Sequence, residues 1–207
     1  MAKTEKISEA VIRRLPIYLR YLTHLQEMGI TTVSSQQMGS TLDVNPAQIR
    51  KDLAAFGEFG KKGIGYDVQY LIGKIRHILN IDQELRIAVV GAGHLGHAIS
   101  NYNDYLRDNM RIVAIFDTDP QKFGEEIAGL KIQPLAELKQ TVKTRHIRLG
   151  IITVPDFAAQ MVADELIDAG IEGILNFAPI TLRTDKEVRI DYADLTSSLQ
   201  SLAYYLN

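Results

Sequence analysis

The chain has 207 residues, 46% of them hydrophobic and 23% charged, which is the balance of a globular protein with one large domain or two small ones. It contains no cysteine, and this excludes disulfides, Cys-based zinc sites, thiol catalysis and thiol redox sensing. The formal net charge is −2, no apolar run approaches the ~20 residues that span a bilayer, and residues 1–10 lack the apolar stretch of a signal peptide, so we expect a soluble cytoplasmic protein with no membrane partner.

Charge is distributed unevenly along the chain. Residues 1–79 hold 11 Lys and Arg against 7 Asp and Glu, whereas residues 80–207 hold 12 against 18. A basic first part and an acidic second part indicate two modules with different partners. The composition also changes near residues 80–84. We therefore expect a first domain over residues 1–80, a second over residues 81–190, and a terminal helix over residues 191–207.

Three helices are expected in the first domain before its glycine-rich segment. Apolar residues at spacings of three and four predict a helix over residues 8–28, kinked or split at Pro16 and ended at Gly29. Ser34 with Gln37 three residues later is a capping-box pattern that starts a short helix ending near residue 42. Asn45 and Pro46 then start a helix to about residue 55. Its inward residues are expected to be Ile49, Leu53 and Phe56.

The second and third of these helices have the form of a helix–turn–helix. Arg50 can donate two hydrogen bonds to guanine, Gln48 can pair with adenine, and Lys51 can hold a phosphate. Glycines at 57, 60, 63 and 65 predict a hairpin whose small and basic residues would enter a minor groove as a wing. The residues expected at the DNA are Ser35, Gln48, Arg50, Lys51, Lys61, Lys62, Gly63, Gly65 and Tyr66. The alternative is a structural three-helix domain with solvated lysines, and the combined signals favour DNA binding.

The second domain alternates strands and helices. After a helix over residues 67–79, strands are expected in RIAVVG, RIVAIFD, IRLGIITV and GILNFAP. Helices are expected over residues 94–106 and 156–169. This alternation predicts an α/β, doubly wound parallel sheet of the Rossmann type.

A glycine-rich loop follows the first of these strands. Gly91, Gly93 and Gly96 have the spacing in which the first allows a tight turn, the second admits a pyrophosphate, and the third lets helix pack on strand. Asp117 ends the next strand, where a carboxylate bonds the ribose 2′-OH. Asp117 and Asp119 would repel a 2′-phosphate, so NAD(H) is favoured over NADP(H).

Other residues are expected near this cofactor because ligands bind beyond the carboxyl ends of parallel strands. The expected cofactor-binding residues are Gly91, Ala92, Gly93, His94, Leu95, Gly96, Tyr102, Asp117, Thr153, Val154, Pro155, Asn176, Phe177, Ala178 and Pro179. Asn176 offers an amide contact, although ordinary strand-end loops are an equal alternative for the later segments. His94 and His97 lack further ligands nearby in sequence, so no metal is expected.

The last segment, residues 192–206, predicts a helix with Leu195, Leu199, Leu202 and Leu206 on one face. Such a stripe suits either a core helix or a dimer contact. A helix–turn–helix protein that reads a two-fold operator needs a dimer, which favours the shared interface.

The motifs RLPIYLRYL, VSSQQMG, QIRKDLAAFGEFGKKGIGYDV, VGAGHLGHAISNYN, FDTDP, ITVP and GILNFAP occur in this order along the chain. The chain thereby resembles the Rex family of bacterial redox-sensing transcriptional repressors. The resemblance implies a winged helix joined to a Rossmann domain, and a homodimer whose C-terminal helices exchange between subunits. It implies that NADH releases operator DNA and NAD⁺ permits binding. It matches Arg20 and Asp194 to a family pair that links the two halves, and Tyr102 to a tyrosine beside the nicotinamide.

We therefore expect a repressor that senses the NADH/NAD⁺ ratio, with no catalytic residue. Two alternatives stay open. A small NAD-dependent oxidoreductase is disfavoured because residues 80–207 are used by the nucleotide fold, leaving no substrate domain. A regulator that binds another nucleotide or coenzyme A would use the same glycine-rich sheet.

Overall fold

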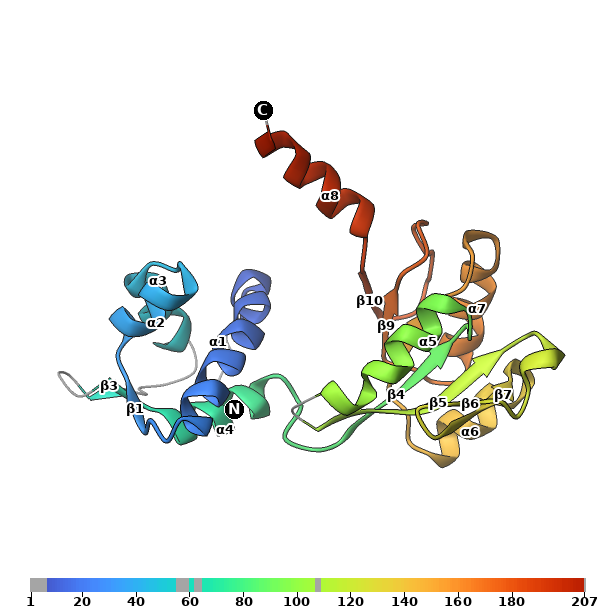
Figure 1. Cartoon of the computed structure of the whole chain (residues 1–207), viewed down its shortest axis with the longest axis horizontal. Coiled ribbons are helices and arrows are strands. Elements are labelled where there is room, and N and C mark those ends of the chain that lie inside the picture. Colours follow the sequence, from blue (N-terminus) through green and yellow to red (C-terminus); the bar gives the residue numbers. More distant parts are fainter. Residues whose placement is uncertain (1–6, 55–59, 62–64, 107–108, 207) are drawn as a thin grey trace. The chain divides into compact units, whose positions relative to one another are not determined.

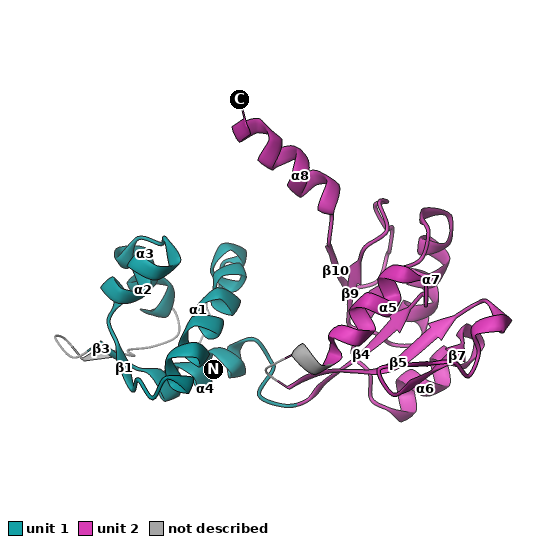
Figure 2. Ribbon diagram, in the orientation of Figure 1, with its two compact units in different colours: residues 1–83 teal, residues 84–207 magenta. Residues whose placement is uncertain are grey.

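The computed structural model describes residues 7–54, 60–61, 65–106 and 109–206 (Figure 1). The chain forms two compact units, Met1–Gln83 and Glu84–Asn207 (Figure 2). Each unit has its own core and is described by itself below. Among the described residues, no helix combines the length and the apolar character needed to cross a membrane.

Unit 1 contains four helices and a small antiparallel sheet in its described part. Its elements are α1 (Glu9–Glu27), β1 (Thr32–Val33), α2 (Ser35–Leu42), α3 (Pro46–Ala54), β2 (Gly60–Lys61), β3 (Gly65–Asp67) and α4 (Val68–Ile78). The strand order is β1-β3-β2, and both pairs are antiparallel. Helix α1 packs against α4, and α2 packs against α3. This is a winged-helix arrangement, as predicted.

Helix α1 continues through Pro16, so the expected split does not occur. Proline removes one N–H from the helix and disturbs the carbonyl four residues earlier. Pro16 itself is exposed. Leu15, Tyr18, Leu19 and Leu22 are at most 2% exposed around it. Packing of this buried stripe stabilises the helix across the break, as is usual for helices in proteins.

The predicted start signals of α2 and α3 are confirmed. The Ser34 hydroxyl accepts a hydrogen bond from the Gln37 N–H at 3.1 Å, and the Gln37 carboxamide oxygen accepts one from the Ser34 N–H at 2.8 Å. The Asn45 side chain accepts from the Ala47 N–H at 2.8 Å, and α3 begins at Pro46. Ile49 and Leu53 are buried as expected. Phe56 lies outside the described residues.

A buried carboxylate joins α1 to α3. Asp52 is 1% exposed and accepts four hydrogen bonds. Arg14 Nε and Nη2 donate at 2.6 and 2.8 Å, the Tyr18 hydroxyl at 2.8 Å, and Gln48 Nε2 at 2.6 Å. Burial acts to raise the pKa of Asp52, but the bonds from Arg14, Gln48 and Tyr18 outweigh it and lower that pKa. The carboxylate therefore stays charged and holds the two helices at a fixed spacing.

Unit 2 has a seven-stranded sheet covered by helices. Its elements are β4 (Leu85–Val90), α5 (His94–Asn101), β5 (Met110–Asp117), β6 (Glu126–Ile127), β7 (Leu130–Pro134), α6 (Leu138–Thr144), β8 (Leu149–Ile152), α7 (Asp156–Asp168), β9 (Gly173–Asn176), β10 (Arg189–Tyr192) and α8 (Leu195–Ala203). The strand order is β10-β9-β8-β4-β5-β7-β6. All pairs are parallel except β6 with β7.

The sheet has a core on each face, which is the doubly wound arrangement predicted. Alternate residues of β4 point to opposite faces. Ala88 and Val90 pack with residues of α6 and α7, whereas Ile87 and Val89 pack on the side of Ile99 in α5. The sequence did not indicate β6, β7, α6 or β10. Strand β6 and helix α6 are short, and buried and exposed residues do not alternate regularly along β7 and β10.

Two predicted helices were too long. The helix expected over residues 94–106 ends at Asn101 and is followed by a 3₁₀ turn, Tyr102–Tyr105. The helix expected from residue 192 begins at Leu195, because Tyr192 belongs to β10 and Asp194 caps α8.

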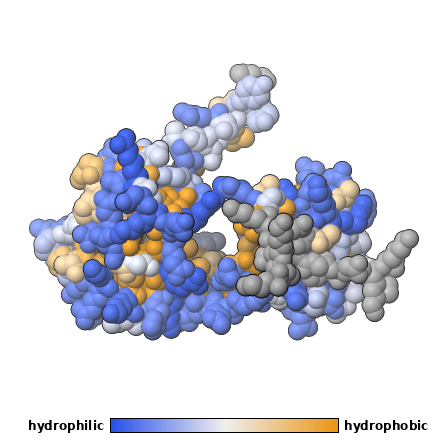
Figure 3. All heavy atoms as spheres, turned by 180° about the vertical axis from the view of Figure 1, so that it is seen from behind, coloured by the Kyte–Doolittle hydropathy of each residue, from blue (hydrophilic) through white to orange (hydrophobic). Residues whose placement is uncertain are grey.

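The leucine stripe of α8 is not part of the core of this chain. Leu195, Leu199 and Leu202 are 72%, 57% and 57% exposed, and no residue of α8 is buried. In Figure 3 the terminal segment at the top carries hydrophobic as well as hydrophilic side chains. An exposed stripe of this kind is typical of a helix that packs against another chain.

Replacing Asp52 with alanine should lower the free energy of unfolding at pH 7 by about 3 kcal/mol, the low end for breaking a buried ion pair, because the Arg14 side chain keeps 26% exposure. Because folding lowers the pKa of Asp52, the charged pair contributes its full stabilisation at pH values above the ordinary carboxyl pKa of 3.8. This stabilisation is lost as the pH falls through the lower pKa that Asp52 has in the folded protein. Urea unfolding of both proteins should therefore show a constant difference near neutrality that shrinks below about pH 4. A difference that grows on acidification would contradict the charged pair.

Candidate functional site

The first candidate site is the exposed face of α3. Arg50 and Lys51 are exposed, and Arg50 Nη1 donates a hydrogen bond to the Ser35 hydroxyl at 3.0 Å. Ser35 at the start of α2 and Arg50 on α3, both expected at the DNA, are thus brought together. Gln48 is half-buried and directs its amide nitrogen to Asp52. The other N–H donors of Arg50 and the Lys51 ammonium group are of the kind that binds phosphates and base edges.

The second part of this site is the hairpin of β2 and β3. Gly65 has φ +92°, and a Cβ there would lie 2.6 Å from the Val33 carbonyl oxygen, so only glycine fits. Tyr66 is 9% exposed, and burial raises its pKa, so it offers little surface to a partner. Lys61 belongs to β2. Lys62 and Gly63 lie outside the described residues, so their expected part in the wing stays a prediction.

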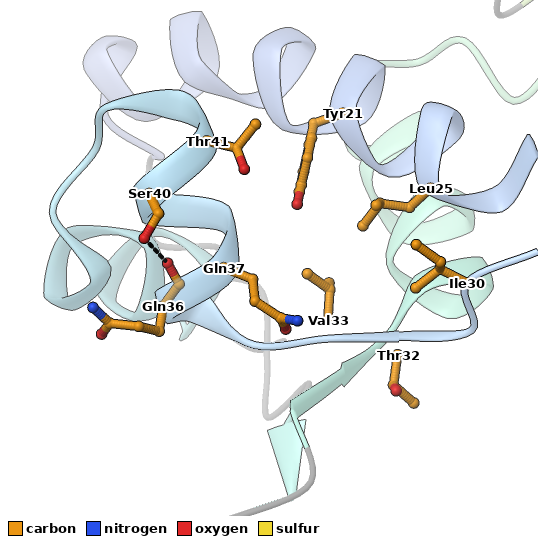
Figure 4. A pocket seen from close by; sticks show the side chains of 9 residues that line it. All are labelled: Tyr21, Leu25, Ile30, Thr32, Val33, Gln36, Gln37, Ser40 and Thr41. Carbon is orange, nitrogen blue, oxygen red and sulfur yellow. Dashed lines mark hydrogen bonds between the residues drawn. The ribbon is translucent and has the colours of Figure 1, made fainter. Parts of the chain in front are cut away.

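Unit 1 also has a hollow between α1, β1 and α2, with a volume of about 350 Å³ (Figure 4). The Tyr21 hydroxyl points into it from α1, opposite Gln37 of α2. The lining comprises Tyr21, Leu25, Ile30, Thr32, Val33, Gln36, Gln37, Ser40 and Thr41. None of these side chains is charged at neutral pH, so the hollow holds no acid–base pair and no counter-charge for an ionic ligand.

The third region is the loop between β4 and α5, where each glycine meets a different constraint. Gly91 has φ +106°, and a Cβ there would lie 2.8 Å from the Thr153 carbonyl oxygen. A Cβ at Gly96 would lie 1.8 Å from the Gly91 carbonyl oxygen. At Gly93 a Cβ would meet no atom within 4 Å. The first and third glycines are therefore required by the fold, and the second leaves space for a ligand to approach the backbone.

The residues expected around this loop lie at one edge of the sheet. Strands β9, β8, β4 and β5 are neighbours in that order and parallel. Gly91, Asp117, Thr153 and Asn176 stand at or just after their carboxyl ends. The strand that follows β4 in the chain, β5, lies on one side of β4, whereas the later strand β8 lies on its other side. Open parallel sheets bind their ligands at the carboxyl end of the sheet where the chain changes sides in this way.

Asp117 is held by three donors. Its carboxylate accepts hydrogen bonds from the Ala92 N–H at 2.7 Å, the Asp119 N–H at 2.9 Å and Lys122 Nζ at 3.0 Å. Burial acts to raise the pKa of Asp117, but the bonds from Asp119, Lys122 and Ala92 lower it overall. A carboxylate has about four acceptor positions, so one is left for a further donor such as a ribose hydroxyl. Sequence reasoning missed Lys122, whose only signal was a cation five residues after the acid.

Thr153 and Asn176 shape the walls of the site. The Thr153 hydroxyl lies 3.0 Å from the Val90 carbonyl oxygen and 2.8 Å from that of Gly91, so it can donate to either. Asn176 is 1% exposed, donates to the carbonyls of Ala178 and Ile180, and accepts from the Ala178 N–H. Both amide N–H groups of Asn176 are therefore engaged within the loop, and the expected amide contact to a ligand is not available in this arrangement. The side chain instead fixes the course of residues 176–180.

The other expected residues differ in exposure. Tyr102 is 58% exposed at the start of the 3₁₀ turn, and Leu95 is 44% exposed in the first turn of α5. The remaining ones are His94, Pro155 and Pro179, which are exposed, Val154 and Phe177, which are half-buried, and Ala178, which is buried. Within the described ranges, no three His, Asp or Glu side chains gather as a metal site would require.

Arg20 and Asp194 belong to different units. Arg20 is exposed on α1. The Asp194 carboxylate caps α8 by accepting hydrogen bonds from the Ser197 N–H at 3.0 Å and from the Ser197 hydroxyl, and the hydroxyl bond leads the effects that lower its pKa. The spacing Asp194–Ser197 was a capping signal that the sequence analysis did not use.

Comparison with known proteins gives matches to both units. The family described as CoA binding domain matches residues 82–180, and the family described as putative DNA-binding protein N-terminus matches residues 6–54. The chain is 71% identical over 206 residues to a redox-sensing transcriptional repressor Rex of Brevibacillus brevis, covering 100% of each chain. It is 46% identical to a repressor of the same name from Chloroflexus aggregans, covering 100% of this chain and 97% of that protein.

The fold also matches solved structures over both units. The crystal structure of RSP in complex with β-NAD⁺ and operator DNA superposes with a TM-score of 0.91 at 37% identity, covering 98% of this chain and 93% of that one. RSP in complex with β-NADH superposes with a TM-score of 0.86 at 35% identity, covering 97% and 94%.

Replacing Gly96 with alanine should lower the free energy of unfolding by about 3 kcal/mol, because the new Cβ overlaps a backbone oxygen that no side-chain movement can clear. The matched control is Gly93→Ala, at a position with φ −83° and open space, which should change stability by less than about 1 kcal/mol. Denaturant unfolding of the two variants measures the difference. Equal effects would mean that the close approach of α5 to β4 is not a constraint.

Proposed function

The chain belongs to the Rex family of redox-sensing transcriptional repressors, and from this premise we propose that it represses transcription by binding operator DNA through unit 1 and responds to NADH and NAD⁺ through unit 2. The observation that carries the proposal is the full-length likeness to a repressor structure that holds both β-NAD⁺ and operator DNA, at 37% identity over 98% of this chain. Supporting it, unit 1 presents an exposed helix face with Arg50 and Lys51, and unit 2 has a glycine-rich loop after β4.

At the DNA, we propose that α3 lies in the major groove and the β2–β3 hairpin contacts the minor groove. Arg50 has five fixed N–H donors and stands exposed, so it suits a guanine edge, with Lys51 on a phosphate. Ser35, Gln48, Lys61, Lys62, Gly63, Gly65 and Tyr66 complete the proposed surface. Tyr66 is the weakest of them because it is nearly buried.

At the cofactor, the fit rests on the open space at Gly93 and on the unused acceptor position of Asp117. The N–H groups at the start of α5 would hold the pyrophosphate, and Asp117 a ribose hydroxyl. The nicotinamide ring is positively charged when oxidised and neutral when reduced. Val154, Pro155, Phe177, Ala178 and Pro179 offer no charge to a buried cation, so these walls favour the reduced form.

For signalling between the sites, we propose a homodimer with α8 as the exchanged contact. The support is the exposed leucine stripe of α8 and the need of a two-fold operator for two reading helices. We further propose domains over residues 1–80, 81–190 and 191–207, with Arg20, Tyr102 and Asp194 as the contacts that change when NADH binds.

A repressor of this kind is not expected to be an enzyme, because the relatives that match this chain over its whole length are named transcriptional repressors. It acts where the chromosome is, so we place it in the cytoplasm. Coenzyme A stays a second candidate ligand because the matching family over residues 82–180 is described by it. Calorimetric titration with NADH, NAD⁺ and coenzyme A distinguishes these ligands.

Coupling between the two sites is the central test. If NADH releases the protein from DNA, operator DNA must weaken NADH binding by the same factor, because coupling is reciprocal. We expect a factor of about 5 to 150, corresponding to about 1–3 kcal/mol. NADH titration of the full-length protein with and without an operator duplex measures it. Identical NADH affinity in the two titrations would contradict an NADH-controlled repressor.

Nucleotide preference should depend on the Asp117–Lys122 pair. Asp117→Asn keeps an acceptor for the Ala92 N–H but removes the negative charge and frees Lys122, so the affinity for NADPH relative to NADH should rise about tenfold, the size of one charge-assisted hydrogen bond. Lys122→Ala should shift the ratio the other way by leaving the carboxylate charge unopposed. Calorimetry of both variants with both nucleotides tests this. Shifts in the same direction would mean that another residue selects the ribose.

A further inference from the structure

The buried carboxylate of Asp52 makes a contact that the proposed reading of DNA does not explain. One of its four hydrogen bonds comes from Gln48 Nε2, four residues earlier on α3, at 2.6 Å. Four bonds are about the full acceptor capacity of a carboxylate, so Asp52 has no position left for another donor. At 1% exposure it cannot itself contact a nucleic acid. Its effect on DNA must therefore pass through a neighbouring side chain.

The hydrogen bond to Asp52 restricts which atoms of the Gln48 side-chain amide face outward. A carboxylate only accepts hydrogen bonds, so it binds the amide nitrogen of Gln48 and repels the carboxamide oxygen. The flipped amide would place that oxygen against a negative charge. The orientation with the nitrogen inward is thus the favoured one, and it leaves the oxygen and one N–H of this half-buried side chain for an outside partner. One acceptor beside one donor is the pattern that pairs with the major-groove edge of adenine.

We propose that Asp52 is a positioning residue for sequence recognition, fixing the Gln48 amide in one orientation so that α3 distinguishes adenine from the other bases at one position of each half-site. This rests on the proposed function, because it requires that α3 reads DNA. The role of Arg14 and Tyr18 is to hold the carboxylate charged and in place from α1. Arg14 also compensates a negative charge that would otherwise lie near the DNA backbone.

The test compares Asp52→Asn with a matched control. The carboxamide that this substitution introduces can donate to the Gln48 oxygen as well as accept from its nitrogen, so both amide orientations become possible. Tyr18→Phe removes a different bond, to Asp52 Oδ2, and leaves the Gln48 bond to Oδ1. Asp52→Asn also removes the charge that pairs with Arg14 and one of the two oxygens, each of which accepts two hydrogen bonds, whereas Tyr18→Phe removes one bond and keeps the ion pair. Only Asp52→Asn releases Gln48, and a general loss of stability in that variant would weaken binding to every duplex alike. Equal NADH affinity in all proteins checks that unit 2 is intact.

The readout is base preference. A duplex selected by the wild-type protein from random sequences is changed one base pair at a time, and competition binding is measured for the full-length proteins without NADH. We expect Gln48→Ala to flatten the preference at one base pair, Asp52→Asn to reduce discrimination at the same base pair about fivefold or more, and Tyr18→Phe to keep it. In the Gln48→Ala background, Asp52→Asn should change nothing further.

The proposal is overturned if Asp52→Asn weakens binding to every duplex equally, or alters a base pair that Gln48→Ala leaves unchanged. Failure of the proposed function gives a different result, since the wild-type protein would then select no sequence at all. A second measurement does not depend on the variant folding. In the DNA-free wild type, NMR relaxation should show slower motion of the Gln48 side-chain amide than of the exposed Gln36 amide, and equal mobility would overturn the proposal.

Discussion

The close approach of α5 to the end of β4 is the constraint on which the site of unit 2 depends. A Cβ at Gly96 would lie 1.8 Å from the Gly91 carbonyl oxygen, so helix and strand meet with backbone against backbone. The same carbonyl lies 2.8 Å from the Thr153 hydroxyl, which links the end of β8 to the loop. One oxygen thus fixes the loop, the start of the helix and a neighbouring strand end. Between these two constrained glycines, Gly93 faces open space.

The corresponding constraint in unit 1 is the buried carboxylate of Asp52, not a close contact between backbone atoms. Asp52 is separated by 38 residues from Arg14, and their ion pair crosses from α3 to α1. Removing the partner of a buried charge costs far more than the pair contributes over apolar packing. We infer that such a pair contributes more by disfavouring arrangements that leave Asp52 unpaired than by adding stability. If α3 reads DNA as proposed, this restriction matters because a small rotation of α3 would move Arg50 and Lys51 away from the base edge and the phosphate proposed for them.

Local signals in the sequence predicted most of the fold, whereas features that depend on distant partners were missed. The capping box at Ser34, the start of α3 at Pro46 and the glycine loop each depend on residues within a few positions of one another. The edge strand β10 was missed because three of its four residues are exposed, and β7 was missed because most of its residues are half-buried, so no alternation of buried and exposed residues marks either strand. Of the two expected effects of Pro16, a kink or a split, the split does not occur, because tertiary packing outweighs one lost hydrogen bond. At the candidate site, the sequence left Asn176 open between an amide contact to a ligand and an ordinary loop residue, and the hydrogen bonds of its side chain to residues 178 and 180 are contacts that no spacing rule indicates.

Asp52 and Asp117 share a physical property that residue type alone does not give. Each is buried and charged, and each is kept so by three or four donors that outweigh the effect of burial on its pKa. A carboxylate with most of its acceptor positions filled has little capacity left for a ligand, but it strongly restricts the groups that fill them. At Asp117 these groups include the backbone of the glycine loop, and at Asp52 they include the half-buried amide of the reading helix. For both units we therefore propose the same arrangement, in which a carboxylate that is almost completely buried orients the groups that contact the ligand.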